Sequence, residues 1–114
     1  MVDTDYNILS RARILLVEAD EAVRASMVDY FIDITRLFTA VKSAEEALPL
    51  LEGPLWDIVV CSLKLPGING LEFSKLATQQ RPGTKIVLAT QHPSQPLKEK
   101  AAEQGVVETI SAPL

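Results

Sequence analysis

The stretch Asp57-Ile-Val-Val-Cys-Ser62-Leu-Lys-Leu-Pro66-Gly67-Ile-Asn-Gly70 decides the fold of this chain. Its first part, residues 58–62, is apolar up to Ser62, which is the pattern of a strand covered on both faces of a parallel sheet. Leu-Lys-Leu-Pro-Gly follows as a turn, and a helix is predicted from about Leu71. The stretch therefore predicts a strand, a turn and a helix in that order.

The same alternation continues on both sides of this stretch. Asp20 is a good N-cap for a first helix, Ser43-Ala-Glu-Glu46 is a capping box that opens a second, and Ser94 can cap a fourth. The predicted strands cover residues 14–17, 36–41, 58–62, 85–90 and 106–110. The first helix is expected to bury one apolar face, made of Val23, Met27, Tyr30, Phe31 and Ile34.

Strands that alternate with helices predict an α/β fold with a parallel sheet and right-handed crossovers. We expect a flavodoxin-like, doubly wound sheet of five strands in the order 2-1-3-4-5, because strands one, three and four have the uniformly apolar character of central strands. In such folds the reactive crevice lies at the carboxyl ends of the strands, between strands one and three. This places Glu18, Ala19 and Asp20 beside Ser62.

Composition narrows the possible functions. The 114 residues suffice for one domain with a real core, and we assign residues 1–11 to an N-terminal extension and residues 12–114 to the domain. A net charge of −4, with no basic cluster beyond Arg11 and Arg13, argues against nucleic-acid binding. Cys61 is the only cysteine, so it forms no intrachain disulfide, and it fits a small core hydrophobe. Short apolar runs and an acidic N-terminus favour neither a membrane span nor a secretory signal, so we expect a cytoplasmic protein.

From about Arg13 to Leu114, the chain resembles the receiver domain of response regulators in two-component signalling. Strand–acid–helix, strand–Leu-Lys-Leu-Pro-Gly, strand–Thr and Gly–strand–x-Pro occur in the order and spacing of that family. The resemblance implies phosphoryl transfer, in which two acids after strand one hold Mg²⁺ and an aspartate at the end of strand three accepts the phosphoryl group. It also implies a Thr or Ser after strand four and a Lys after strand five that bind the phosphoryl oxygens, and an aromatic switch near that Lys.

The chain departs from this pattern at most of the positions that carry the chemistry. The positions concerned are Glu18, Ala19, Ser62, Thr90, Thr109 and Ala112. Glu18 matches the first acid, but Ala19 stands at the second, and Ser62 replaces the phosphate-accepting aspartate. Ala112 replaces the lysine, Thr109 stands at the aromatic switch, and only Thr90 is retained. We therefore expect a degenerate pseudo-receiver with no catalytic residue, no metal ligand set and at most weak Mg²⁺ binding.

Several of these residues also have simpler structural explanations. Asp20 is better explained as a helix cap than as a substitute metal ligand, and Ser62 as a strand-end hydroxyl bonded to nearby backbone. Glu18 is either a solvated acid or a remnant of the acid pocket, and the sequence leaves both open. Lys64 is best explained as a solvated loop lysine, although its ammonium could swing toward Glu18. His92 has no second metal ligand nearby.

We expect a response-regulator receiver domain that is not phosphorylatable and acts as a protein-interaction module rather than as an enzyme. Its expected partner is a protein: a histidine kinase, another receiver or an output domain. Two alternatives stay open: an active phosphoacceptor that uses a non-standard residue, and a small-molecule binder on a flavodoxin-like sheet. Against the second, no glycine-rich phosphate loop follows any predicted strand.

The resemblance also implies a fifth helix after strand five, for which the chain has no residues after Leu114. A sheet face left bare would form an apolar patch, which usually marks an interface. The N-terminal segment could cover it, since Val2, Tyr6 and Leu9 share helical spacing, or a second copy could do so. We expect a homodimer to which the N-terminal residues contribute.

Overall fold

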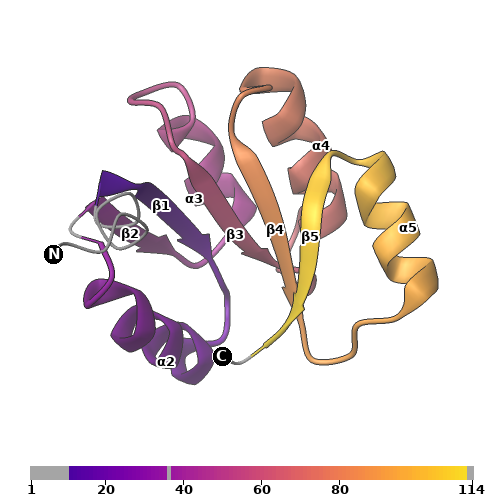
Figure 1. Ribbon diagram of the computed structural model, residues 1–114, viewed down its shortest axis with the longest axis horizontal. Coiled ribbons are helices and arrows are strands. Elements are labelled where there is room, and N and C mark those ends of the chain that lie inside the picture. Colours follow the sequence, from indigo (N-terminus) through magenta and orange to yellow (C-terminus); the bar gives the residue numbers. More distant parts are fainter. Residues whose placement is uncertain (1–10, 36, 113–114) are drawn as a thin grey trace, which may run out of the picture.

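The computed structural model describes residues 11–35 and 37–112, which form a five-stranded sheet with four helices (Figure 1). The strands are β1 (Arg13–Val17), β2 (Leu37–Val41), β3 (Ile58–Ser62), β4 (Lys85–Thr90) and β5 (Val106–Ser111). The helices are α2 (Glu21–Ile32), α3 (Ala44–Leu50), α4 (Gly70–Gln80) and α5 (Gln95–Glu103). Two predictions concern residues outside the described ones. They are the start of the second strand at Arg36 and the helical spacing of Val2, Tyr6 and Leu9.

The sheet has the predicted order, β2-β1-β3-β4-β5, and every neighbouring pair of strands is parallel. The predicted fold class is therefore confirmed. The three central strands, β1, β3 and β4, are the most apolar, because helices pack on both faces of the sheet. The ladder between β4 and β5 contains one irregularity, next to Ile86 and Val87.

Two hydrophobic clusters lie on opposite faces of the sheet. The larger cluster includes residues from α3, α4 and α5, such as Ala47, Phe73 and Ala101, packed on Leu15 and Val59. The smaller cluster contains Met27 and other residues of α2, packed on the opposite sheet face. Within the described residues, three helices thus cover one face of the sheet, and α2 alone covers the other (Figure 1).

The predicted helix caps are confirmed. The side chain of Asp20 accepts a hydrogen bond from the backbone N–H of Val23, and Ser43 and Ser94 cap α3 and α5 in the same way. Glu46, the last residue of the predicted capping box, accepts from the backbone N–H of Lys42 at 2.9 Å, one residue before the N-cap Ser43. These bonds satisfy donors that the first helical turn leaves unpaired.

The expected apolar face of the first helix is partly wrong. Met27 is buried, but Tyr30 is 52% exposed. Tyr30 packs edge-on against Phe31, with ring centroids 5.1 Å apart, and Phe31 stacks on Phe38 of β2. The ring of Phe31 thus takes the position against the sheet, and Tyr30 lies outside it.

Among the described residues, no helix has the length and apolar character needed to cross a membrane.

Candidate functional site

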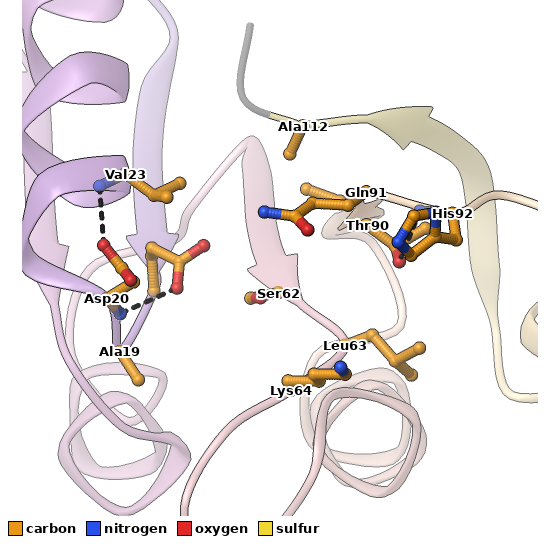
Figure 2. A pocket seen from close by; sticks show the side chains of 12 residues that line it. Ala19, Asp20, Val23, Ser62, Leu63, Lys64, Thr90, Gln91, His92 and Ala112 are labelled. Atoms are coloured by element: carbon orange, nitrogen blue, oxygen red, sulfur yellow. Dashed lines mark hydrogen bonds between the residues drawn. The ribbon is translucent and has the colours of Figure 1, made fainter.

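The carboxyl ends of β1, β3, β4 and β5 meet around one cavity of about 350 Å³ (Figure 2). The parallel registers bring these ends together, because Val17 pairs with Cys61 and Ser62 pairs with Ala89. The cavity is lined by Glu18, Ala19, Asp20, Val23, Ser62, Leu63, Lys64, Ala89, Thr90, Gln91, His92 and Ala112. The crevice predicted from the sequence is thus present, at the predicted edge of the sheet.

The acidic side of the cavity is formed by the turn between β1 and α2. Glu18 is only 6% exposed, and its Oε2 accepts a hydrogen bond from the backbone N–H of Asp20 at 2.9 Å. Asp20 Oδ1 accepts in turn from the backbone N–H of Val23 at 2.9 Å. Glu18 is therefore mostly buried and lies in the predicted acid pocket, although only its Oε2 has a partner within the described residues, and the interpretation of Asp20 as a helix cap is confirmed.

Arg24 holds this turn in place from the first helix. Its Nη1 donates to the main-chain carbonyl of Glu18 at 2.9 Å and to that of Ala19 at 3.3 Å. The guanidinium therefore binds the backbone of the turn, and no ion pair with the Glu18 carboxylate is recorded in the described part of the chain. The sequence analysis missed this contact, although a cation four residues after a helix cap could have indicated it.

Ser62 lies at the end of β3 and faces the centre of the cavity (Figure 2). Its side chain is half-buried, and within residues 11–35 and 37–112 it makes no recorded hydrogen bond. The predicted bond from this hydroxyl to nearby backbone is therefore not found.

The neighbouring Cys61 points into the core, where burial raises the pKa of its thiol to about 11. Because the thiolate is the reactive form, Cys61 is inert at neutral pH.

The far side of the cavity is formed by the ends of β4 and β5. Thr90 Oγ1 accepts a hydrogen bond from the backbone N–H of His92 at 3.3 Å. The amide of Gln91 lies between Ser62 and Ala112 and reaches toward the middle of the cavity (Figure 2). Sequence analysis missed Gln91, which its position directly after a strand end could have signalled.

The two remaining predicted positions differ in their placement. Ala112 lines the cavity with a methyl group, and the Gln91 amide lies between it and Ser62 in Figure 2. Thr109 is 8% exposed and pairs with Leu88 in the sheet, so it shares the face of Leu88 and does not line the cavity. The structure therefore brings together all of the predicted site residues except Thr109.

The loop after β3 forms the floor of the opening. Lys64 is exposed, and in Figure 2 its side chain runs away from the side of the cavity that holds Asp20. Farther along this loop, the backbone N–H of Ile68 donates to Glu45 Oε2 of α3 at 3.1 Å. Gly67 has φ +71°, a conformation that favours glycine, and makes the turn beside Glu45. The loop is thus tied to α3, and Lys64 lies on it.

The side chains that line the cavity can be compared with the ligands that a divalent cation prefers. Mg²⁺ prefers an octahedral shell of oxygen atoms, including at least one or two carboxylates. Ala19 offers no side-chain donor, and one oxygen each of Glu18 and Asp20 is occupied by a backbone N–H. Within the described residues there is no group of three or more His, Cys, Asp or Glu side chains suited to a metal.

Comparison with known proteins shows similarity over most of the chain. The family model described as Response regulator receiver domain matches residues 14–114. The chain is 30% identical to the response regulator protein FleR of Pseudomonas aeruginosa over 102 residues, which cover 90% of this chain and 22% of FleR. It is 28% identical to the response regulator UvrY of Escherichia coli, over 86% of this chain and 46% of UvrY. The chain thus spans less than half the length of these curated relatives.

Solved structures show the same similarity. The signal receiver domain of an HD domain-containing protein from Pseudomonas fluorescens is 27% identical and has a TM-score of 0.81, with coverage of 90% of this chain and 76% of that chain. The chemotaxis response regulator CheY4 of Vibrio cholerae has a TM-score of 0.83 at 21% identity, over 90% of this chain and 88% of CheY4. At that lower identity, the likeness concerns the fold alone.

Proposed function

Because this chain belongs to the response regulator receiver domain family, it is a receiver domain of a two-component response regulator, and we propose that it works without phosphorylation, as a protein-interaction module. Receiver domains of response regulators interact with kinases and with output domains. In our proposal this domain keeps the interaction and has lost the phosphoryl switch. It is accordingly not an enzyme, and its partner is a protein.

The observation that carries this proposal is the side chain at the end of β3. Ser62 stands where the sequence resemblance places a phosphate-accepting aspartate, and it faces the cavity. A serine hydroxyl becomes a useful nucleophile only with an adjacent general base. No side chain of the described residues is recorded in a hydrogen bond with Ser62, so nothing supports its activation.

The surroundings of Ser62 support the same proposal. Phosphoryl transfer depends on cations that neutralise the charge of the transferred group. Ala19 removes a carboxylate from the metal position, and Ala112 places a methyl group where a lysine would be expected. The residues present do not fit a resident Mg²⁺.

An assay with acetyl phosphate tests the proposal. We expect the chain to gain no phosphate when it is incubated with acetyl phosphate and Mg²⁺ and measured by intact mass spectrometry. As a positive control, the triple variant Ala19→Asp, Ser62→Asp, Ala112→Lys restores the nucleophile, the acid and the cation and should become phosphorylated. Ser62→Asp alone should not, because the new carboxylate lies near Glu18 without a compensating cation.

The assay has one outcome that rejects the proposal. A stable gain of one phosphate on the unaltered chain, mapped to Ser62 or to any acid of the cavity, would show an active phosphoacceptor. A triple variant that folds but gains no phosphate would instead show that our assignment of these positions to the phosphotransfer motif is wrong.

A further inference from the structure

Glu18 is a buried carboxylate with one oxygen left free. Its side chain is 6% exposed, and Oε2 accepts from the backbone N–H of Asp20. Within the described residues, every side-chain oxygen or nitrogen that is fully buried has a hydrogen-bond partner. Oε1 has no recorded partner there, so it is the part of the side chain that reaches solvent. Because Glu18 lines the cavity, Oε1 faces into it.

No ion pair of this carboxylate is found among the described residues, although Lys64 also lines the cavity. The nearest recorded guanidinium, that of Arg24, binds main-chain carbonyls instead. A cation that enters the cavity could donate a charge-assisted hydrogen bond to this carboxylate, and such bonds are stronger than those between neutral groups. The cavity therefore favours a ligand that brings one positive charge to Oε1.

The walls of the cavity define the shape of that ligand. Apolar side chains line much of it, namely Ala19, Val23, Leu63, Ala89 and Ala112. Hydroxyl groups of Ser62 and Thr90 lie on the same lining. An aliphatic stem with a cationic end matches this arrangement, since the stem can pack on the apolar walls while the charge meets the acid.

The free oxygen also distinguishes between cations. A guanidinium pairs best with a carboxylate through two parallel hydrogen bonds, one to each oxygen; Oε2 keeps a second lone pair but already accepts from the N–H of Asp20, and the side chain is only 6% exposed, so little of it is open to a second donor. An ammonium is a compact charge that needs only one oxygen, and its remaining N–H groups are free to donate elsewhere. The geometry of Glu18 thus favours an ammonium over a guanidinium.

We infer that this cavity receives a lysine side chain of the protein partner, with its ammonium against Glu18. The inference rests on the proposed role of the domain as an interaction module, and it names the chemistry that the module recognises. Lys64 of the chain itself is the internal competitor. Lys64 lines the cavity, but its side chain is exposed and in Figure 2 runs away from the side that holds Asp20, which leaves that side accessible to a lysine from outside.

The inference can be tested by NMR with the whole isotope-labelled chain. The probe is the peptide acetyl-Gly-Lys-Gly-amide, and the matched peptides carry norleucine or arginine in place of lysine. We expect saturable shifts of the amide signals of Ala19, Asp20, Ser62 and Gln91 with the lysine peptide. The norleucine peptide, which keeps the stem and lacks the charge, should cause none, and the arginine peptide should bind more weakly.

Variants of the chain separate the cavity from general surface charge. Glu18→Gln keeps the shape of the side chain and should weaken binding at least about tenfold, because it removes the buried charge of the pair. Glu21→Gln removes an exposed acid outside the cavity and should leave binding unchanged. Ala112→Leu, which keeps Glu18 and fills the cavity, should also abolish binding.

Several outcomes would overturn the inference. Unchanged affinity in Glu18→Gln would do so, as would equal binding of the norleucine peptide. If Lys64→Gln bound the lysine peptide more than about tenfold more tightly than the unaltered chain, Lys64 would be the cation that normally occupies the cavity. Tighter binding of n-butylammonium than of the lysine peptide, by the same factor, would indicate a free amine rather than a protein.

Failure of this inference is distinguishable from failure of the proposed function. If the lysine peptide causes no shift of the amide signals while acetyl phosphate leaves the chain unmodified, only the ligand of the cavity has been assigned wrongly. If Mg²⁺ shifts the same amide signals and the chain is phosphorylated, the proposed function fails, and the inference fails with it.

Discussion

Gly70 shows how one residue fixes the geometry of the site. It is the first residue of α4 and is buried directly against the end of β3. A Cβ atom at this position would lie 2.1 Å from the carbonyl oxygen of Ser62 and 2.9 Å from the Cα of Leu63. Both are backbone atoms, which cannot rotate away. The absence of a side chain at Gly70 therefore lets the helix begin close to the strand that carries Ser62.

We expect Gly70→Ala to lower the free energy of unfolding by about 1–3 kcal/mol, the range for overpacked sites. Gly83→Ala is the matched control, because no atom lies within 4 Å of a Cβ built there. The control should change the free energy of unfolding by less than about 1 kcal/mol and can raise it by restricting the unfolded chain. Denaturant unfolding followed by circular dichroism measures both. Equal losses in the two variants would contradict the role given to Gly70.

At the scale of residues, the sequence was informative where family positions could be matched. The positions of Glu18, Ala19, Ser62 and Ala112 around one crevice follow from strand ends, which the apolar runs mark clearly. Burial of Glu18 could not be predicted, since it depends on a hydrogen bond within the turn and on packing from several elements.

The first helix, α2, links the fold to the site at the scale of elements. The backbone N–H of its N-cap, Asp20, donates to the Glu18 side chain, and the Arg24 guanidinium donates to the main-chain carbonyls of Glu18 and Ala19. The same helix packs on the smaller cluster through Met27. Docking of this helix and placement of the acidic turn are therefore coupled.

We expect Asp20→Ala to lower the free energy of unfolding by about 1 kcal/mol, because the cap of α2 is lost. Asp20→Asn keeps an acceptor oxygen and should retain most of the stability. Ser94→Ala, which removes the cap of α5, is the control for an ordinary cap outside the cavity. Unfolding measured with and without Mg²⁺ separates the roles of Asp20. Stabilisation by Mg²⁺ that disappears in Asp20→Asn would identify Asp20 as a metal ligand instead.

The start and end of the elements were predicted well where a cap or a glycine marks them. Capping residues act through local hydrogen bonds, so Asp20, Ser43 and Ser94 could be recognised without knowledge of the fold. The exposure of Tyr30 could not, because it depends on which of two adjacent aromatic rings meets β2. Periodicity gives the side of a helix but not the contacts that it makes.

At the scale of the whole molecule, the sheet is covered unequally. The strand order could be predicted from the sequence because strands one, three and four have the uniformly apolar character of central strands in a doubly wound sheet. The distribution of exposed apolar surface could not. On the face covered by α2 alone, Ile58, Val87 and Ile110 are only partly buried in the described structure. These three residues form a patch on β3, β4 and β5 that a second copy could cover.

We expect the 114-residue chain to form a homodimer at micromolar concentration, because twofold pairing would bury this patch on both copies. Analytical ultracentrifugation measures the state directly. Val87→Asp places a charge in the patch and should give a monomer, with circular dichroism to confirm that it is folded. Leu55→Asp is the matched control, since Leu55 is 68% exposed and lies in the loop before β3. Residues 1–10 are expected to contribute to the contact, so their deletion should weaken the dimer. A clean monomer that loses no stability when residues 1–10 are deleted would exclude both the second copy and the N-terminal segment as covers of this face.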